Sequence, residues 1–233
     1  MLIKHKGIII FSKLYKDNDL FIKLLSNSDE IISGIVYGGL SKKKRNIFQK
    51  GFYLNFEISI ISNKPNSING ELIKPYMSNI IDNKYKVNCL LSVVSLINLS
   101  LIEGQSIKNI FNAVDDFINK MFETKKWFSD YCIFLFKLLK LIGYEINFLD
   151  NIDKIYFDIK TFKFTKFKSK NSVEFPFKLL ENNNYKTNKV DVQNIFKIFE
   201  LVFVKYHLTN FNLQLPNQYH LFKKLILKEL KYE

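Results

Sequence analysis

Residues 52–61 read Phe-Tyr-Leu-Asn-Phe-Glu-Ile-Ser-Ile-Ile, and this stretch decides how the first third of the chain folds. Every second residue from Phe52 to Ile60 is apolar, and the residues between them are mostly polar. Because successive side chains of a strand point to opposite faces of a sheet, this alternation predicts a strand with one buried face.

Four more runs, rich in β-branched and aromatic residues, lie at 7–14, 20–25, 31–37 and 68–76. Turn-type residues separate these runs, for example Gly38-Gly39 and the segment 63–67. Five short strands within about 75 residues predict a small closed barrel or sandwich. Five is the strand number of the OB-fold, a partly open Greek-key barrel that commonly binds oligonucleotides.

After Pro75 the apolar residues recur with the period of helices. Helices are predicted over 82–101, from a cap at Ser106, from about Ser129 to Gly143, over 191–206, and from Pro216 onward. An irregular excursion or a small hairpin is predicted around residues 152–188. The predicted fold class is therefore α+β with two domains: an OB-fold nucleic-acid-binding domain over 1–80, and an all-α helical domain over 81–233 that carries this excursion.

The charge of the chain is strongly positive and unevenly distributed. Lys and Arg number 35 against 22 Asp and Glu, a net charge of +13, while 47% of residues are hydrophobic. Residues 1–80 carry +6, residues 81–150 carry zero, and residues 151–233 carry +7. This favours a globular protein with a polyanionic partner over a disordered or acidic one. Arg45 is the single arginine, so compositional drift toward lysine is the alternative explanation of the charge.

One local feature stands out as a candidate binding site. Lys42, Lys43, Lys44 and Arg45 follow one another directly after the Gly38-Gly39 step, between the third and fourth predicted strands. Cations there can neutralise a nucleic-acid backbone along a barrel groove, although an ordinary solvated loop has the same composition. Tyr37 and Lys50, which flank this run, complete the predicted nucleic-acid-binding set.

A second basic surface is predicted from four closely spaced lysines in the C-terminal third, Lys163, Lys166, Lys168 and Lys170. This surface could contact a second nucleic-acid strand or grip an acidic peptide tail. The sequence does not choose between these two partners.

The sequence contains no recognised catalytic motif. It lacks the phosphate-binding Gly-x-x-x-x-Gly-Lys-Ser/Thr spacing, the Gly-x-Gly-x-x-Gly fingerprint and the Gly-x-Ser-x-Gly elbow. His5, His207 and His220 are too scattered to predict a metal set or a general base, and His207 is expected at the surface. We therefore predict a protein that is not an enzyme and has no catalytic or metal-ligating residues.

Cys89 and Cys132 lack a Cys-x-x-Cys partner and are predicted to be reduced, buried thiols. The widest charge-free window, Val87 to Ile102, is 16 residues long and contains several polar residues, too short and polar to span a bilayer. No export signal is recognisable at the start of the chain. A cytoplasmic protein without a membrane partner is expected.

Several stretches of the chain resemble the RecO family of bacterial DNA repair proteins and recombination mediators. Their order, spacing and total length carry the resemblance more than any one of them. They are Gly7–Ile10 (GIII), Asp19–Leu25 (DLFIKLL), Ile35–Lys44 (IVYGGLSKKK), Leu101–Gln105 (LIEGQ), Phe134–Tyr144 (FLFKLLKLIGY) and Leu215-Pro216.

The resemblance implies an N-terminal OB-fold followed by helices, in a protein that binds single- and double-stranded DNA and anneals complementary strands. It also implies two protein partners, RecR and the acidic C-terminal tail of single-stranded DNA-binding protein, in loading the recombinase RecA. The basic stretch of the family falls on Ser41 to Arg45. The family usually has an arginine where Leu40 stands, and often another near Gln218. Part of the phosphate contact is therefore expected to have moved to lysines, which bind phosphate as point charges.

Some RecO proteins bind zinc through cysteines that begin just after the Gly-Tyr pair matched here by Gly143-Tyr144. The segment after this pair contains no cysteine in this chain. We therefore expect no zinc and no other cofactor.

The hypothesis from the sequence is a DNA repair and recombination mediator that works by binding and annealing DNA. Two alternatives stay open. One is an RNA-binding OB-fold protein, because the fold by itself does not choose between ribose types. The other is a helical protein-interaction adaptor for which DNA binding is incidental.

Overall fold

A computed structural model describes residues 2–60, 62–151, 155–181 and 187–230. The chain divides into two compact units: Met1–Asn112 with Pro216–Tyr219, and Ala113–Leu215 with His220–Glu233. The change from strands to helices falls between Lys74 and Lys84. A boundary between independently folding domains at residue 80 stays a prediction.

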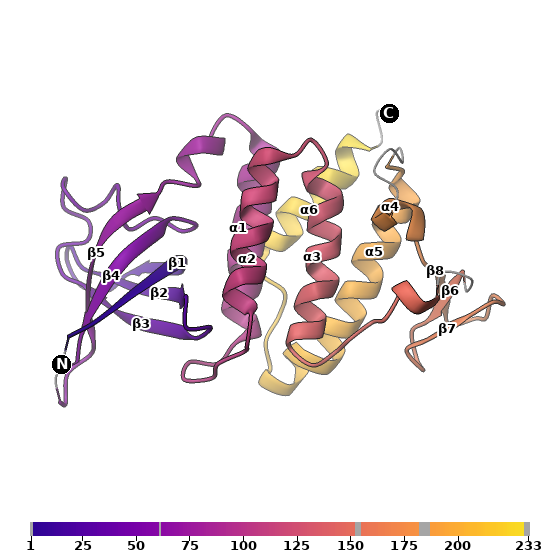
Figure 1. Cartoon of the computed structure of the whole chain (residues 1–233), viewed down its shortest axis with the longest axis horizontal. Coiled ribbons are helices and arrows are strands. Elements are labelled where there is room, and N and C mark those ends of the chain that lie inside the picture. Colours follow the sequence, from indigo (N-terminus) through magenta and orange to yellow (C-terminus); the bar gives the residue numbers. More distant parts are fainter. Residues whose placement is uncertain (1, 61, 152–154, 182–186, 231–233) are drawn as a thin grey trace. The chain divides into compact units, whose positions relative to one another are not determined.

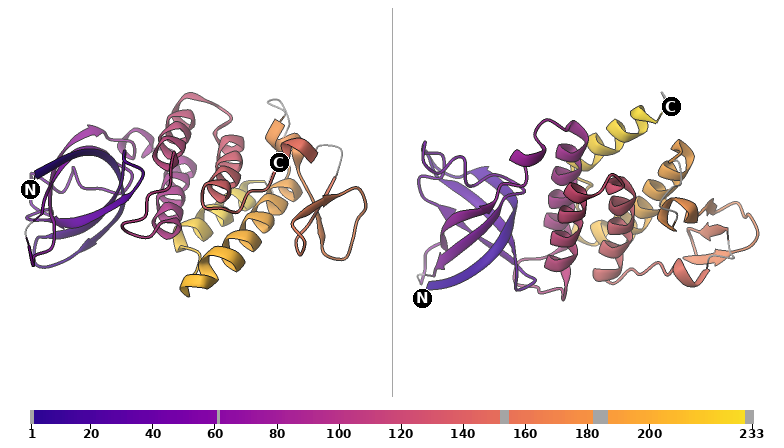
Figure 2. Two further views of the ribbon diagram at one scale, coloured as in Figure 1. Left: turned by 60° about the horizontal axis from the view of Figure 1, so that its bottom comes forward. Right: turned by 45° about the horizontal axis from the view of Figure 1, so that its top comes forward.

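Five strands form a closed barrel in the first unit, in the order β1-β2-β3-β5-β4 (Figures 1 and 2). β4 pairs back onto β1, and all pairings are antiparallel except the short parallel contact between β3 and β5. The five predicted strands are thus confirmed, as is the α+β class with an OB-fold type of barrel. The bounds are β1 Leu2–Leu14, β2 Leu20–Ser26, β3 Ile31–Val36, β4 Tyr53–Ser59 and β5 Ser67–Lys74.

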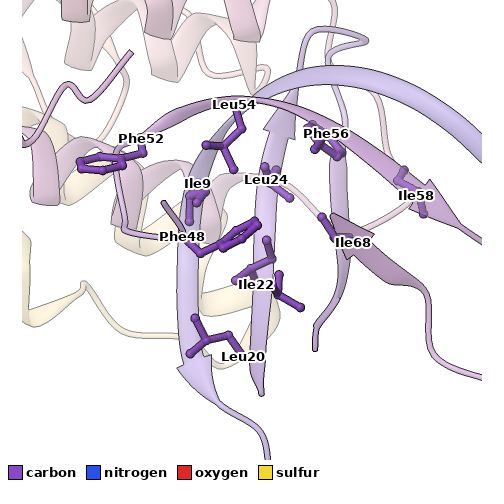
Figure 3. Close-up of a cluster of buried hydrophobic side chains, with 11 residues drawn as sticks. Ile9, Leu20, Ile22, Leu24, Phe48, Phe52, Leu54, Phe56, Ile58 and Ile68 are labelled. Atoms are coloured by element: carbon purple, nitrogen blue, oxygen red, sulfur yellow. The ribbon is translucent and has the colours of Figure 1, made fainter. Parts of the chain in front are cut away.

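The inward-facing apolar side chains of the strands fill the barrel (Figure 3). Phe56 lies in this core, and the ring is accommodated because Gly7 stands on the neighbouring strand. A Cβ at Gly7 would lie 2.9 Å from Phe56 Cε1 and 2.7 Å from the Leu25 carbonyl oxygen. The core residues are Ile9, Leu20, Ile22, Leu24, Val36, Phe48, Phe52, Leu54, Phe56, Ile58 and Ile68.

The first helix, α1 (Lys84–Ser100), packs on the outside of the barrel within the same unit (Figure 1). It begins at Asn83, whose side-chain oxygen accepts hydrogen bonds from the N–H groups of Tyr85 and Lys86, at 3.1 Å each. Gly51 adopts a positive φ of 82°, and a Cβ there would approach Leu90 of α1 to 2.9 Å. A short 3₁₀ turn, Ser78–Ile80, precedes the helix.

The N-terminus of α2 (Ile110–Glu123) differs from the sequence prediction. Ser106 does not cap this helix, because its hydroxyl donates to the carbonyl oxygen of Ser28 at 3.4 Å. The cap comes from Asp29 in the β2–β3 turn, whose carboxylate accepts from the N–H groups of Asn109 at 2.8 Å and Phe111 at 2.9 Å. A carboxylate is favourable there because the N–H groups and the dipole of the helix both point toward it.

The second unit is built from helices joined by aromatic contacts. Phe117 of α2 stacks on Phe134 of α3 with ring centroids 5.0 Å apart, and Tyr131 of α3 meets Phe222 of α6 edge-on at 4.8 Å. The bounds are α3 Trp127–Leu141, α4 Phe177–Glu181, α5 Lys189–Val202 and α6 Asn217–Glu229, with a π turn Phe203–His207 and 3₁₀ turns Leu149–Asn151 and Leu208–Phe211.

The predicted excursion contains a three-stranded antiparallel sheet, one strand more than a hairpin, ordered β7-β6-β8 (Figure 1). The strands are β6 Tyr156–Asp158, β7 Lys163–Thr165 and β8 Ser172–Glu174. Phe175, directly after β8, is buried and makes ring contacts with five other phenylalanines, at 136, 148, 157, 164 and 177. Residues 152–154 and 182–186 of the excursion lie outside the described part of the chain.

Both cysteines are buried and neither forms a disulfide, as predicted. Complete burial raises the pKa of the Cys132 thiol far above its ordinary value, because the charged thiolate would be poorly solvated there. Among the described residues, no helix has the length and apolar character needed to cross a membrane.

The Asp29 cap leads to a first prediction. Replacing Asp29 with Ala removes both acceptors. It also places at a φ of 64° a residue without the short polar side chain that lets Asp and Asn tolerate this left-handed conformation. We expect the free energy of unfolding to fall by about 2 kcal/mol, roughly half from each effect. Urea unfolding followed by circular dichroism measures this loss. Asp29→Asn tolerates the backbone and keeps one acceptor, so it should lose less; an equal loss in both variants would contradict the cap.

Candidate nucleic-acid interface

The predicted basic residues lie in the loop between β3 and β4, residues 37–52, whose first turn is fixed to the β1–β2 turn. The N–H of Gly38 donates to Asp19 Oδ1 at 2.7 Å, and the N–H of Leu40 donates to the Asn18 carbonyl oxygen at 2.9 Å. Gly38 can make this turn because its φ is +62°, where a side chain would be strained. The two loops therefore form one continuous rim at this end of the barrel.

The loop itself winds into a helical turn and is anchored in the barrel. The N–H groups of Lys44 and Arg45 both donate to the Ser41 carbonyl oxygen at 3.0 Å. Phe48, which follows this turn, is only 3% exposed and belongs to the barrel core (Figure 3). A buried aromatic anchor thus holds a basic turn at the surface.

Within this loop, Lys42, Lys43 and Arg45 are exposed, as a phosphate contact requires. Lys44 is half-buried, and its Nζ donates to the Tyr37 carbonyl oxygen at 3.0 Å. Tyr37 is 53% exposed, so its ring is accessible. The structure thereby brings together the predicted residues of this loop except one.

The exception is Lys50, for which the structure shows a contact with an aromatic ring of β1. Its Nζ is 5.5 Å from the centroid of Phe11. Phe11 meets Phe21 of β2 edge-on at 6.3 Å, and Lys13 Nζ lies 5.5 Å from the centroid of Phe21. We call these four residues the Phe11–Phe21 surface.

Sequence reasoning missed three members of this surface, Phe11, Lys13 and Phe21. They lie on the outer face, since Leu20 and Ile22 on either side of Phe21 point into the barrel. The strand alternation at 7–14 and 20–25 indicates which side chains face outward. Only the register, which pairs Lys13 with Phe21, shows that side chains of the two strands lie next to each other. Aromatic rings beside cations are the elements with which OB-folds hold single strands.

A cavity on the barrel lies elsewhere, over β1, β4 and β5. It has a volume of about 580 Å³ and contains none of the predicted binding residues. Lys4 and Lys6 line it together with Glu57 and Glu71, and Lys4 pairs with Glu57 at 3.1 Å. Because its charges balance, this cavity is a poorer phosphate site than the basic loop, and the binding role of that loop stays a prediction.

The remaining predicted residues belong to the second unit. Lys163, Lys166, Lys168 and Lys170 are all exposed and lie on β7 and in the loop that follows it. His207 is not a surface residue as expected: it is 8% exposed and its ring stacks on Phe203 at 5.2 Å. The π turn at 203–207 places it among aromatic rings, which its position at a predicted helix end did not indicate.

Among the described residues, no group of three or more His, Cys, Asp or Glu side chains is placed to hold a metal ion. The expectation of a protein without zinc stays a prediction.

The fold and these surfaces define the class: an OB-fold protein with a basic, aromatic-bearing barrel, followed by helices. No protein-family model matches the sequence. Curated relatives do: DNA repair protein RecO of Rickettsia canadensis is 30% identical over 148 residues, 63% of this chain and 61% of the relative. RecO of Rickettsia bellii is 31% identical over 150 residues, and that of Rickettsia akari is 31% identical over 149.

The chain spans about three-fifths of the length of these relatives. The matches confirm the resemblance to the RecO family that the sequence motifs indicate. These matches rest on residue identities alone, and the geometry of the barrel plays no part in them.

The Phe11–Phe21 surface predicts a stacking contribution from β2. Phe21→Leu keeps apolar bulk against Phe11 but removes the ring face, so affinity for oligo(dT) should fall at least about fivefold, the lower end for one stacked base. Fluorescence anisotropy measures this affinity. Ile81→Ala, which trims another exposed apolar side chain of the same unit, is the control. Equal affinities of Phe21→Leu and the parent would exclude stacking at Phe21.

Proposed function

We propose that this protein acts in DNA repair and homologous recombination as a mediator that binds single- and double-stranded DNA and anneals complementary strands. It further helps load the recombinase onto DNA coated with single-stranded DNA-binding protein. The observation that carries this proposal is the similarity to DNA repair RecO proteins, found in a chain whose OB-fold barrel carries an anchored basic loop. We place its action in the cytoplasm and assign it no catalytic step.

Annealing follows from charge neutralisation. Two complementary strands repel each other through their phosphates, and this repulsion slows their encounter. Lys42, Lys43 and Arg45 on the barrel would neutralise one strand, and the second basic surface around Lys166 and Lys168 would neutralise another. Each contact releases condensed counterions, so binding weakens as salt rises.

The proposal includes two protein partners, RecR and the acidic tail of single-stranded DNA-binding protein. An open apolar cavity of about 350 Å³ on α5 and its π turn supports a site for the tail, with Leu201 and Val204 in its lining and Lys197 and Lys205 beside them. Glu200 also lines it, but Lys223 holds this carboxylate at 2.6 Å and offsets its charge.

An annealing assay with complementary strands coated with single-stranded DNA-binding protein tests the proposed function. We expect the protein to accelerate annealing of coated strands well above the rate without it. Faster annealing of bare strands alone would leave a DNA-binding protein that does not remodel the coat. No acceleration with either substrate would overturn the proposal.

Two parallel measurements separate the alternatives. Competition between matched DNA and RNA oligomers shows an RNA-binding role if RNA wins. Partner capture that survives high salt, together with negligible DNA binding at moderate salt, would indicate the helical adaptor.

The basic loop predicts a change in salt dependence. Replacing Lys42, Lys43, Lys44 and Arg45 together with Ala should weaken single-strand binding and flatten the slope of log K against log salt by about 0.7 for each lost phosphate contact. A titration at several salt concentrations gives this slope.

The control for this variant removes four exposed lysines from elsewhere, Lys108, Lys120, Lys125 and Lys126, and so changes the net charge equally. Its slope should stay close to that of the parent. Equal slopes in both quadruple variants would show that net charge, and not the loop, determines binding.

A further inference from the structure

Phe167, in the loop between β7 and β8, is exposed in an unusual way for this chain. It is 84% exposed, more than any other large apolar side chain in the described residues. The protein contains 23 phenylalanines, and many of them form its cores. The ring of Phe167 is therefore accessible to a ligand, and its neighbours decide which kind of ligand suits it.

The loop that presents Phe167 is ordered by its own hydrogen bonds. Thr165 Oγ1 donates to the Phe167 carbonyl oxygen at 2.9 Å, on the side of β7. On the side of β8, Ser172 Oγ accepts from the N–H of Ser169 at 2.7 Å and donates to the Ser169 carbonyl oxygen at 2.9 Å. The ring is therefore presented by a preorganised backbone, which reduces the entropy lost on binding.

The base of the loop is fixed by the small sheet. Phe164 of β7 meets Phe157 at 5.1 Å and Phe175 at 5.0 Å between ring centroids. These three rings provide the packing of the sheet on this side, and Phe167 takes no part in it. Removing the Phe167 ring should therefore leave the sheet folded.

The charge around Phe167 is positive. Residues 155–177 carry five lysines and two acidic residues, and Lys166 and Lys168 flank Phe167 directly. The Asp158 carboxylate is committed to the sheet: it accepts from the N–H groups of Thr161 at 2.9 Å and Lys160 at 3.0 Å, and from Ser169 Oγ at 3.2 Å. These hydrogen bonds, above all the one from the Thr161 N–H, hold the pKa of the Asp158 carboxyl below its usual range.

An exposed ring between lysines matches the chemistry of a single-stranded nucleic acid. A ring can stack only on a base whose face is free, and a duplex covers these faces. Lysines on both sides suit the phosphates that flank such a base. An acidic peptide would use the lysines but not the ring, and an anionic membrane would use both.

We propose that residues 166–171 form a second nucleic-acid site that is specific for single strands, in which Phe167 stacks on a base and Lys166, Lys168 and Lys170 contact phosphates. This inference rests on the proposed function in that the chain binds DNA, and it extends it by assigning strand selectivity to one residue. The loop is a site of its own on the second unit, with its own ring and cations.

The test measures binding of oligo(dT) and of a duplex of equal length to the full chain carrying Phe167→Ala. The measurement is made in the parent and in the quadruple variant of the basic loop, so that barrel binding does not mask the effect. We expect single-strand affinity to fall about 5- to 150-fold, with an unchanged salt slope because no charge is lost. Duplex affinity should stay the same.

Two further variants make the result specific. Phe167→Trp should restore single-strand affinity, and its indole emission should be quenched by oligo(dT) beyond any change of Trp127 in the parent. Leu221→Ala, which removes another exposed apolar side chain of the same unit, should change neither affinity. Lys166, Lys168 and Lys170 replaced together with Ala should lower the salt slope by about 0.7 per lost contact.

Several results would overturn the inference. Unchanged oligo(dT) binding by Phe167→Ala, or an equal loss on duplex, excludes a single-strand stacking site. Loss of binding to vesicles that contain anionic lipid, with oligo(dT) binding retained, assigns the loop to a membrane instead. If the parent chain itself binds no DNA, the proposed function fails. If the parent binds DNA but Phe167→Ala binds oligo(dT) as tightly as the parent, only this second site fails.

Discussion

Closure of the first sheet on itself is the constraint on which the rest of the structure depends. Once β4 pairs with β1, every strand has one face in a shared apolar interior and one face outside. The short parallel contact between β3 and β5 completes the ring, so no strand lies at a fully free edge of the kind that open sheets must protect. The outer positions and the loops at the barrel ends are then available for polar chemistry, and the candidate interface uses both.

The same closure explains how a lysine-rich loop can be part of a defined surface. Phe48 and Phe52 come from the loop and its end, yet both are buried in or beside the barrel interior. The loop thus adds to the core that holds it. Because Phe48 is buried, the turn before it holds its cations in a defined place at the surface, and less conformational entropy is lost on binding than with a flexible basic segment.

Much of the fold could be predicted from the sequence because its signals are local. The alternation at 52–61 and the helical periods after Pro75 depend on neighbouring residues, and both produced the elements found. The cap of α2 could not be predicted, since Asp29 lies 80 positions before Asn109 and only the fold joins them. Likewise, Ile8, Ile9 and Ile10 are all buried although only Ile9 belongs to the barrel core. The helix α1 packs against β1 from a distant part of the sequence, so the alternation alone does not predict this burial.

The candidate site divides in the same way. The run from Lys42 to Arg45 is visible as four consecutive charges, whereas the Phe11–Phe21 surface needs the strand register to be seen. The sequence shows that Phe167 lies between two lysines, but with so many phenylalanines in the chain its exposure could not be predicted.

Phe175 and the five phenylalanine rings in contact with it determine how the small sheet responds to its surroundings. Strands of three residues cannot hold together by backbone pairing alone, and here aromatic rings supply what a metal or a disulfide supplies in other small modules. The strength of this packing follows temperature, because apolar association weakens on cooling, so the small sheet should loosen in the cold.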